Sequence, residues 1–226
     1  MIKPIVLLVG LGSLSLLPAR ALPAGAPEFA PDLLKEESIA IEFTATSGEC
    51  AVVIKAESET PLGQVAICPK GQRPITELRS NRGSHIALAG FILESEEFTS
   101  SRIFEVYPEG EYEMMATTSD GRRTKGRATL SHRLPAAPQI TFPLEGLAQV
   151  PLNPTITWLA HPEATSYTLG VEQNGDDRLI VLLPAGSNRF QVPLGVLEGG
   201  TETLVEVGAL GANGNCTFYE VSFFTN

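Results

Sequence analysis

The residues that could do chemistry in this sequence are few and widely spaced. The three histidines, His85, His132 and His161, are each more than five residues from one another and from every cysteine, so the spacing of a zinc site is absent. The sequence also contains no nucleophile elbow, phosphate-binding glycine loop or dinucleotide fingerprint. We therefore expect no catalytic residue, no cofactor and no metal ligand, and a protein that is not an enzyme.

Carboxylates outnumber cations along the chain. Asp and Glu total 26 against 16 Lys and Arg, and the net charge of -10 disfavours nucleic acid and anionic membrane surfaces as partners. Glu94, Glu96 and Glu97 could work as paired acids only in a cleft, so we interpret them as solvated surface. The glycosylation sequon at residues 215–217 lies at an expected hairpin turn, and we interpret it as a chance match.

Residues 1–21 have the pattern of a secretory signal peptide. Lys3 is followed by an uncharged apolar run from Ile5 to Leu17 and then by the small-x-small site Ala19-Arg20-Ala21. The run is too short to span a bilayer comfortably. We predict cleavage after Ala21, with Ala26 as a later site, and a secreted or periplasmic mature chain without a membrane span. A retained membrane anchor is the alternative.

Export would place the three cysteines in an oxidising compartment. Cys50 and Cys68 flank residues 57–62, whose composition is typical of a turn, and pairing the flanking strands about Glu59 places the two thiols opposite each other. A Cys50–Cys68 disulfide would then stabilise the chain by about 3 kcal/mol through loop entropy. Three reduced thiols are the alternative, and no base lies near enough in sequence to make any of them a nucleophile.

The elements that would position these residues are short strands. After a spacer at residues 22–36, apolar residues alternate over short stretches separated by Gly, Pro, Ser and Thr, which predicts an all-β fold of two β-sandwich domains. Asp-Gly or Asn-Gly pairs at residues 120–121, 174–175 and 213–214 predict three hairpins. The expected hairpins join residues 112–118 with 124–132, 167–172 with 179–183, and 204–210 with 216–224.

Two short stretches and one connector interrupt this pattern. Residues 32–37 and 100–106 are expected to be helical. The segment 134–138 contains two prolines and no bulky polar group, which predicts a stiff linker. The linker would divide a β-rich N-terminal domain at residues 37–133 from a C-terminal domain at residues 139–226.

The C-terminal half carries a family resemblance. Its motifs are the strand Thr155–Trp158, the strand Ala164–Leu169 with Tyr167, and the segment Leu197–Gly208. In this order they resemble a fibronectin type III domain, which implies an immunoglobulin-like sandwich with Trp158 and Tyr167 in its core. Thr203 occupies the position of the tyrosine that closes a corner in this family.

The N-terminal half is similar to the leading module of uncharacterised bacterial exported proteins that place such a module before a fibronectin type III domain. The resemblance lies in residues 41–46, 68–71, 107–112, 129–132 and 134–135. This group has no established activity, so the resemblance implies architecture alone.

These observations predict an exported, non-catalytic protein that binds or spaces other molecules, with an extracellular or periplasmic protein or glycan as its partner. A carbohydrate-binding accessory protein or an extracellular hydrolase is the alternative. That second function would require exposed aromatic side chains to gather on one surface. The residues that decide this are Phe29, Phe91, Phe98, Tyr107 and Tyr219.

Overall fold

The computed structural model describes residue 29 and residues 33–80 and 88–226. The predicted signal peptide and His85 lie outside these residues. The described part is almost entirely β-structure, with one helix, α1 (Ser100–Val106). The strands are β1 (Leu34–Thr44), β2 (Glu49–Pro69), β3 (Thr76–Arg79), β4 (Leu88–Glu94), β5 (Phe98–Thr99), β6 (Gly110–Thr118), β7 (Arg123–Leu130), β8 (Ile140–Phe142), β9 (Thr155–Trp158), β10 (Ser166–Gln173), β11 (Asp176–Pro184), β12 (Arg189–Gln191), β13 (Glu202–Leu210) and β14 (Cys216–Phe224).

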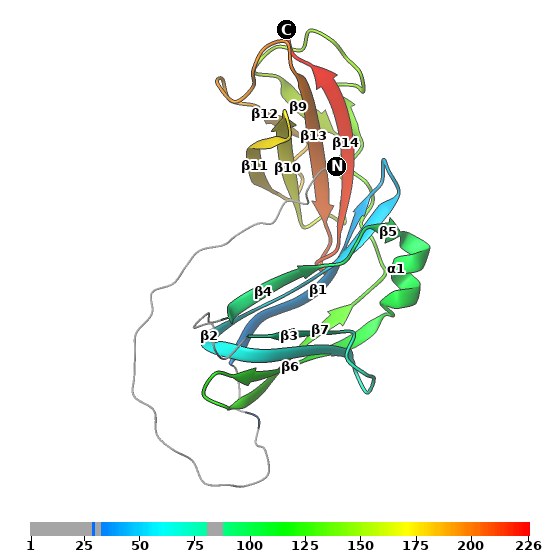
Figure 1. Cartoon of the computed structure of the whole chain (residues 1–226). Coiled ribbons are helices and arrows are strands. Elements are labelled where there is room, and N and C mark those ends of the chain that lie inside the picture. Colours follow the sequence, from blue (N-terminus) through cyan, green and yellow to red (C-terminus); the bar gives the residue numbers. More distant parts are fainter. Residues whose placement is uncertain (1–28, 30–32, 81–87) are drawn as a thin grey trace.

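The strands form two lobes placed end to end (Figure 1), with the C-terminus at the far end of the second lobe. One sheet continues through both lobes in the order β11-β10-β13-β14-β1-β2-β6-β7, and β3, β4 and β5 each pair with β2. A second sheet has the order β12-β9-β8. Each lobe has its own hydrophobic core, which we call the N-terminal and the C-terminal core.

The C-terminal lobe is the β-sandwich that the sequence predicts. Strands β11, β10, β13 and β14 face the three-stranded sheet, and apolar side chains of both sheets fill the space between them. Trp158 is 3% exposed, Tyr167 is fully buried, and their ring centroids lie 5.8 Å apart. Both aromatic residues therefore pack the core, as burial of such large apolar surfaces favours.

All three predicted hairpins are present. Strands β6 and β7, β10 and β11, and β13 and β14 pair antiparallel as neighbours. The turn glycines Gly121, Gly175 and Gly214 have φ angles between 81° and 88°, a region that glycine adopts without steric cost. The predicted helix at residues 100–106 is also present as α1, and its Ile103 is buried in the N-terminal core.

The turn predicted at residues 57–62 is wrong, because β2 runs through it without a break. The first part of β2 pairs with β1 and β4, and its second part pairs with β6 and β3. The register with β4 and with β6 shifts around Leu62. Pro61 has no N–H to donate and is tolerated at such an irregularity. Residues of turn composition thus mark a change of strand partner.

The helix predicted at residues 32–37 is also wrong where the structure describes it. Leu34 begins β1, pairs with Ser58 of β2 and is 4% exposed. A register shift follows, and Glu36 takes a φ of 51° there. Burial of Leu34 and pairing with β2 therefore override the weak local preference for a helical turn.

Candidate functional site

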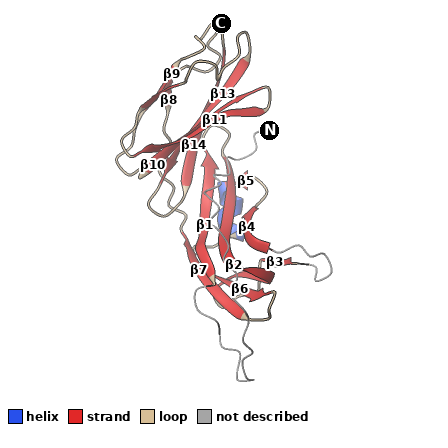
Figure 2. Cartoon of the chain, turned by 90° about the vertical axis from the view of Figure 1, so that its left-hand side faces the viewer, coloured by secondary structure: helices blue, strands red, loops and turns tan. Residues whose placement is uncertain are grey.

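The two lobes are joined by direct strand pairing, which we call the β1–β14 seam. Phe43 pairs with Thr217 in parallel, within a register of three residue pairs that runs from Glu42 and Cys216 to Thr44 and Phe218. The Ala45 amide extends the ladder by donating to the Phe218 carbonyl oxygen at 2.9 Å. Figure 2 shows the end of β1 reaching β14 between the lobes. The lobes are thus connected by backbone hydrogen bonds as well as by the linker.

Asn215 lies at the centre of this junction and is fully buried. Its Oδ1 accepts a hydrogen bond from the Ile41 amide at 2.8 Å. Its Nδ2 donates to the carbonyl oxygens of Ser131 at 2.7 Å and Arg133 at 2.9 Å. Buried polar groups require partners of this kind. Because the side chain is enclosed, the sequon at residues 215–217 is not accessible to a glycan in the folded chain.

Side chains of the C-terminal lobe also hold the predicted linker at both ends. Asn213 Nδ2 donates to the Arg133 carbonyl oxygen at 2.8 Å, and the Arg133 guanidinium contacts both Glu163 carboxylate oxygens at 3.0 and 3.1 Å. His161 Nε2 lies 3.1 Å from the Ala137 carbonyl oxygen. The segment is therefore held by contacts beside its start and near its end.

The two described histidines have structural roles and lie apart. The His132 ring stacks on Phe104 with a centroid distance of 4.1 Å, and its Nε2 lies 2.8 Å from the Tyr107 carbonyl oxygen. His161 faces the linker. Among the described residues, no group of three or more His, Cys, Asp or Glu side chains is arranged to hold a metal ion.

A set of carboxylates gathers on one face of the sheet beside the seam. Glu206 of β13 is directly opposite Glu220 of β14, and Glu42 of β1 is opposite Cys216 of β14. Paired residues on neighbouring strands project to the same face, so one face collects acids from both lobes. We call Glu42, Glu206 and Glu220 the junction carboxylates.

Burial and like charge raise the pKa values of these groups. Burial is the larger cause for Glu42, whose pKa rises to about 7, and Glu94 adds to it. Burial and then Glu220 raise the pKa of Glu206 to about 8. Burial also raises the pKa of Glu220. A hydrogen bond between Glu206 and Glu220 adds to the rise of the Glu206 pKa, as expected when the carboxylic acid of a close pair donates to the carboxylate.

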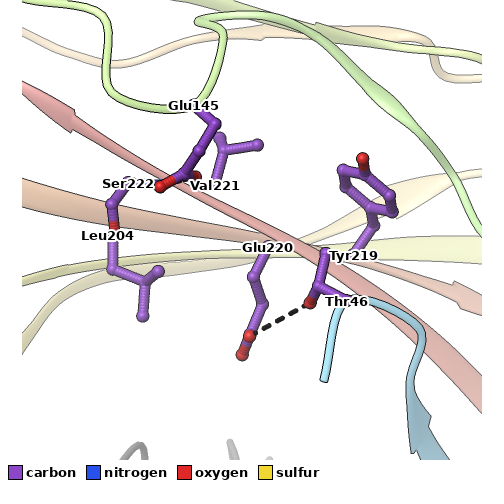
Figure 3. Close-up of a pocket in the computed structure, with 7 residues that line it drawn as sticks. All are labelled: Thr46, Glu145, Leu204, Tyr219, Glu220, Val221 and Ser222. Atoms are coloured by element: carbon purple, nitrogen blue, oxygen red, sulfur yellow. Dashed lines mark hydrogen bonds between the residues drawn. The ribbon is translucent and has the colours of Figure 1, made fainter. Parts of the chain in front are cut away.

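A cavity of about 390 Å³ is lined by one of the junction carboxylates, Glu220. Glu220 points toward Thr46, whose hydroxyl donates to its carboxylate at 3.3 Å, while Glu145 accepts a hydrogen bond from the Ser222 amide at 2.8 Å (Figure 3). The cavity thus combines two carboxylates with the apolar side chain of Leu204. Its lining is formed by Thr46, Glu145, Leu204, Tyr219, Glu220, Val221 and Ser222.

The structure does not bring Cys50 and Cys68 together. They lie near opposite ends of the continuous strand β2, because the turn that would have faced them across a hairpin is absent. Both thiols and that of Cys216 are free and buried. Burial raises the pKa of all three, that of Cys50 to about 11, which disfavours the reactive thiolate.

The aromatic residues that could mark a sugar-binding surface lie in separate places. Phe91 and Tyr107 pack on the N-terminal core, and Tyr219 packs on the C-terminal core. Phe98 is 37% exposed beside α1. Phe29 bridges to Arg123 of β7, where its ring also contacts Lys125. These five side chains therefore do not form one stacking platform.

Sequence reasoning missed the junction carboxylates. Glu42, Glu206 and Glu220 come from three strands, and only the β1–β14 register brings the first to the other two. The predicted surface group at residues 94–97 has a smaller effect on these carboxylates. After burial, Glu97 adds to the raised pKa of Glu94 and of Glu220. For Asn215, the sequence carries two signals: the residue begins a glycosylation sequon, and it directly follows the Asn213-Gly214 turn.

Comparison with known proteins gives fold-level likeness alone. The sequence matches no protein family and no curated protein. Among solved structures, the fibronectin(III)-like modules of Clostridium thermocellum CbhA are 15% identical over 85% of this chain and 93% of theirs, with a TM-score of 0.35. A two-domain fibronectin type III segment of chicken tenascin is 12% identical over 86% of this chain and 100% of its own, with a TM-score of 0.33.

A bacterial ice-binding adhesin is 12% identical over 88% of this chain and 67% of its own, with a TM-score of 0.30. Scores this low carry no functional argument. The all-β, immunoglobulin-like description therefore depends on the strands and cores of this chain. No helix in the described ranges is both long and apolar enough to cross a membrane.

Proposed function

We propose that this chain is an exported, non-catalytic binding or spacer protein whose two domains, at residues 37–133 and 139–226, are held as one rigid body. The observation that carries the proposal is the β1–β14 seam with Asn215 buried beside it. A spacer must keep a fixed distance and orientation between its ends, and independent domains joined by a flexible linker do not. Backbone pairing between the lobes supplies that constraint.

The rigid connection is tested by residual dipolar couplings and 15N relaxation on the mature chain. A single alignment tensor and one rotational correlation time for both lobes are the expected results. A matched variant with a Gly-Ser insertion between Ala136 and Ala137 should keep one tensor, because the seam and Asn215 remain. Independent tensors for the two lobes in the wild-type chain would contradict the proposal.

The partner in this proposal is a protein or glycan outside the cytoplasm. Its support is the leader pattern at residues 1–21 and an acidic chain that does not suit nucleic acid. N-terminal sequencing of exported material should give a chain beginning at Leu22. An intact Met1 would contradict export by cleavage, and turnover of an ester, peptide or glycoside substrate would contradict the non-catalytic function.

A further inference from the structure

The junction carboxylates stand on both sides of the seam. Glu42 belongs to the N-terminal lobe, and Glu206 and Glu220 belong to the C-terminal lobe. Only three residue pairs make up the parallel ladder between β1 and β14. Repulsion between Glu42 and Glu206 therefore acts across the shortest strand pairing on the path from β11 to β7.

We propose that protonation of the junction carboxylates controls the β1–β14 seam, so that the two lobes are held firmly at acidic pH and loosened at alkaline pH. This inference rests on the rigid connection proposed above and adds a condition under which it weakens. The hydrogen bonds of Asn215 involve no titrating group. Loosening is thus expected at the strand pairs and not as full separation of the lobes.

The groups that face the junction carboxylates are acids and a thiol. After burial, the pKa of Glu206 is raised by Glu220, Glu42 and Asp177, the last from β11. After burial, the pKa of Glu42 is raised by Glu94 of β4. Neighbours of Glu220 are the Thr46 hydroxyl, Glu49 of β2, and Glu97. Cys216 lies beside Glu42 and Glu206.

Lys55 is a cation on the same face of the sheet, but it lies four residues along β2 from the position opposite Glu42. Lys55 of β2 stands opposite Ser38 of β1 and Ile92 of β4. It forms no ion pair within the described residues, and neither do Glu42, Glu206 and Glu220. Ionisation of the junction carboxylates therefore adds negative charge that no neighbouring cation offsets.

The direction of the effect follows from the raised pKa values. Glu42 and Glu206 have folded-state pKa values of about 7 and about 8 against an ordinary value of 4.5. Their protonated forms favour the closed seam. That contribution is fully present below pH 4.5 and is lost as the pH rises to about 8.

Amide hydrogen exchange of the full mature chain tests this inference at pH 5.5 and pH 8.5, with EDTA in both buffers to remove bridging cations. The reporter is the Ala45 amide, which donates to Phe218 across the end of the seam. The reference amides lie in the β6–β7 hairpin. After correction for intrinsic exchange rates, the protection of Ala45 should fall about tenfold relative to the reference, the change that one pKa unit of coupling would give.

The matched variants separate these carboxylates from general pH effects. The double variant Glu42→Gln, Glu206→Gln should keep high protection of Ala45 at both pH values. Glu202→Gln, which removes an exposed acid from the same strand β13, should behave as the wild type. A pH-dependent fall that persists in the double variant would overturn the assignment to these groups.

A measurement on the wild-type chain keeps the inference testable if the double variant fails to fold. The side-chain carboxyl 13C resonances of Glu42 and Glu206 should titrate above pH 6, and midpoints near 4.5 would overturn the inference. High protection of Ala45 at both pH values would remove the pH dependence and leave the rigid connection standing. Low protection at both pH values would contradict both proposals.

Discussion

The side-chain amide of Asn215 accepts a hydrogen bond at 2.8 Å from the backbone of Ile41, which is 174 positions away in sequence. The same amide group donates to Ser131 and Arg133. Asn215→Ala therefore leaves the Ile41 amide and the Ser131 carbonyl oxygen without this partner, while the Arg133 carbonyl oxygen keeps its bond from Asn213. Each such group costs about 1–3 kcal/mol, and we expect a loss of about 2–4 kcal/mol in the free energy of unfolding. Urea denaturation followed by circular dichroism measures it.

Asn213→Ala is the matched control because Asn213 is exposed. Its Nδ2 donates to the Arg133 carbonyl oxygen, which also accepts from Asn215, and its Oδ1 accepts a longer bond of 3.2 Å from the Asn215 amide. Its loss should cost about 1 kcal/mol or less. Equal effects of the two substitutions would show that Asn215 has no special part in the junction.

Local signals in this sequence correctly predicted the C-terminal sandwich and the three hairpins. Trp158 and Tyr167 lie in alternating strands, and the Asn-Gly and Asp-Gly pairs define hairpins through their own backbone preferences. The course of β2 could not be predicted this way, because its partner strands are distant in sequence and change near Pro61. The junction carboxylates depend on the same kind of information, since only the parallel register of β1 with β14 places Glu42 on the same face as Glu206.

Gln173 ties the start of β13 to the segment that precedes it. It is 1% exposed, and its Nε2 donates to the Thr203 hydroxyl at 2.7 Å while its Oε1 accepts from the Glu198 amide at 2.8 Å. Gln173→Leu removes the partner of the part-buried Glu198 amide and leaves the Thr203 hydroxyl with its bond to the Thr201 carbonyl oxygen alone, so we expect a loss of about 1–3 kcal/mol. Thermal and urea unfolding measure this loss.

Thr203→Val provides the comparison, because Gln173 keeps its contacts with Glu198. Its cost should be about 1 kcal/mol. A Gln173→Leu protein as stable as the wild type would mean that the corner at the start of β13 needs no polar tie.

The free cysteines predict the thiol content of the mature chain. Cys50, Cys68 and Cys216 are buried and have raised pKa values, so Ellman's reagent should react slowly with the native protein. In 6 M guanidinium chloride it should detect all three thiols. Detection of a single thiol, with a Cys50–Cys68 cross-linked peptide in the mass spectrum, would show that the chain oxidises despite the separation along β2.

Stability at acidic pH should depend on the turn of the β6–β7 hairpin. The Arg122 guanidinium, followed by the Thr118 hydroxyl, lowers the pKa of Asp120 from 3.8 to about 2. A lowered folded-state pKa stabilises the chain above pH 3.8, and this contribution is lost as the pH falls toward 2. Asp120→Asn should therefore reduce the melting temperature at pH 5 and have little effect at pH 2. Asp176→Asn, at the first residue of β11 directly after the β10–β11 turn, is the matched control. A constant difference between the wild type and Asp120→Asn from pH 5 to pH 2 would mean that the carboxylate acts through its shape and not through its charge.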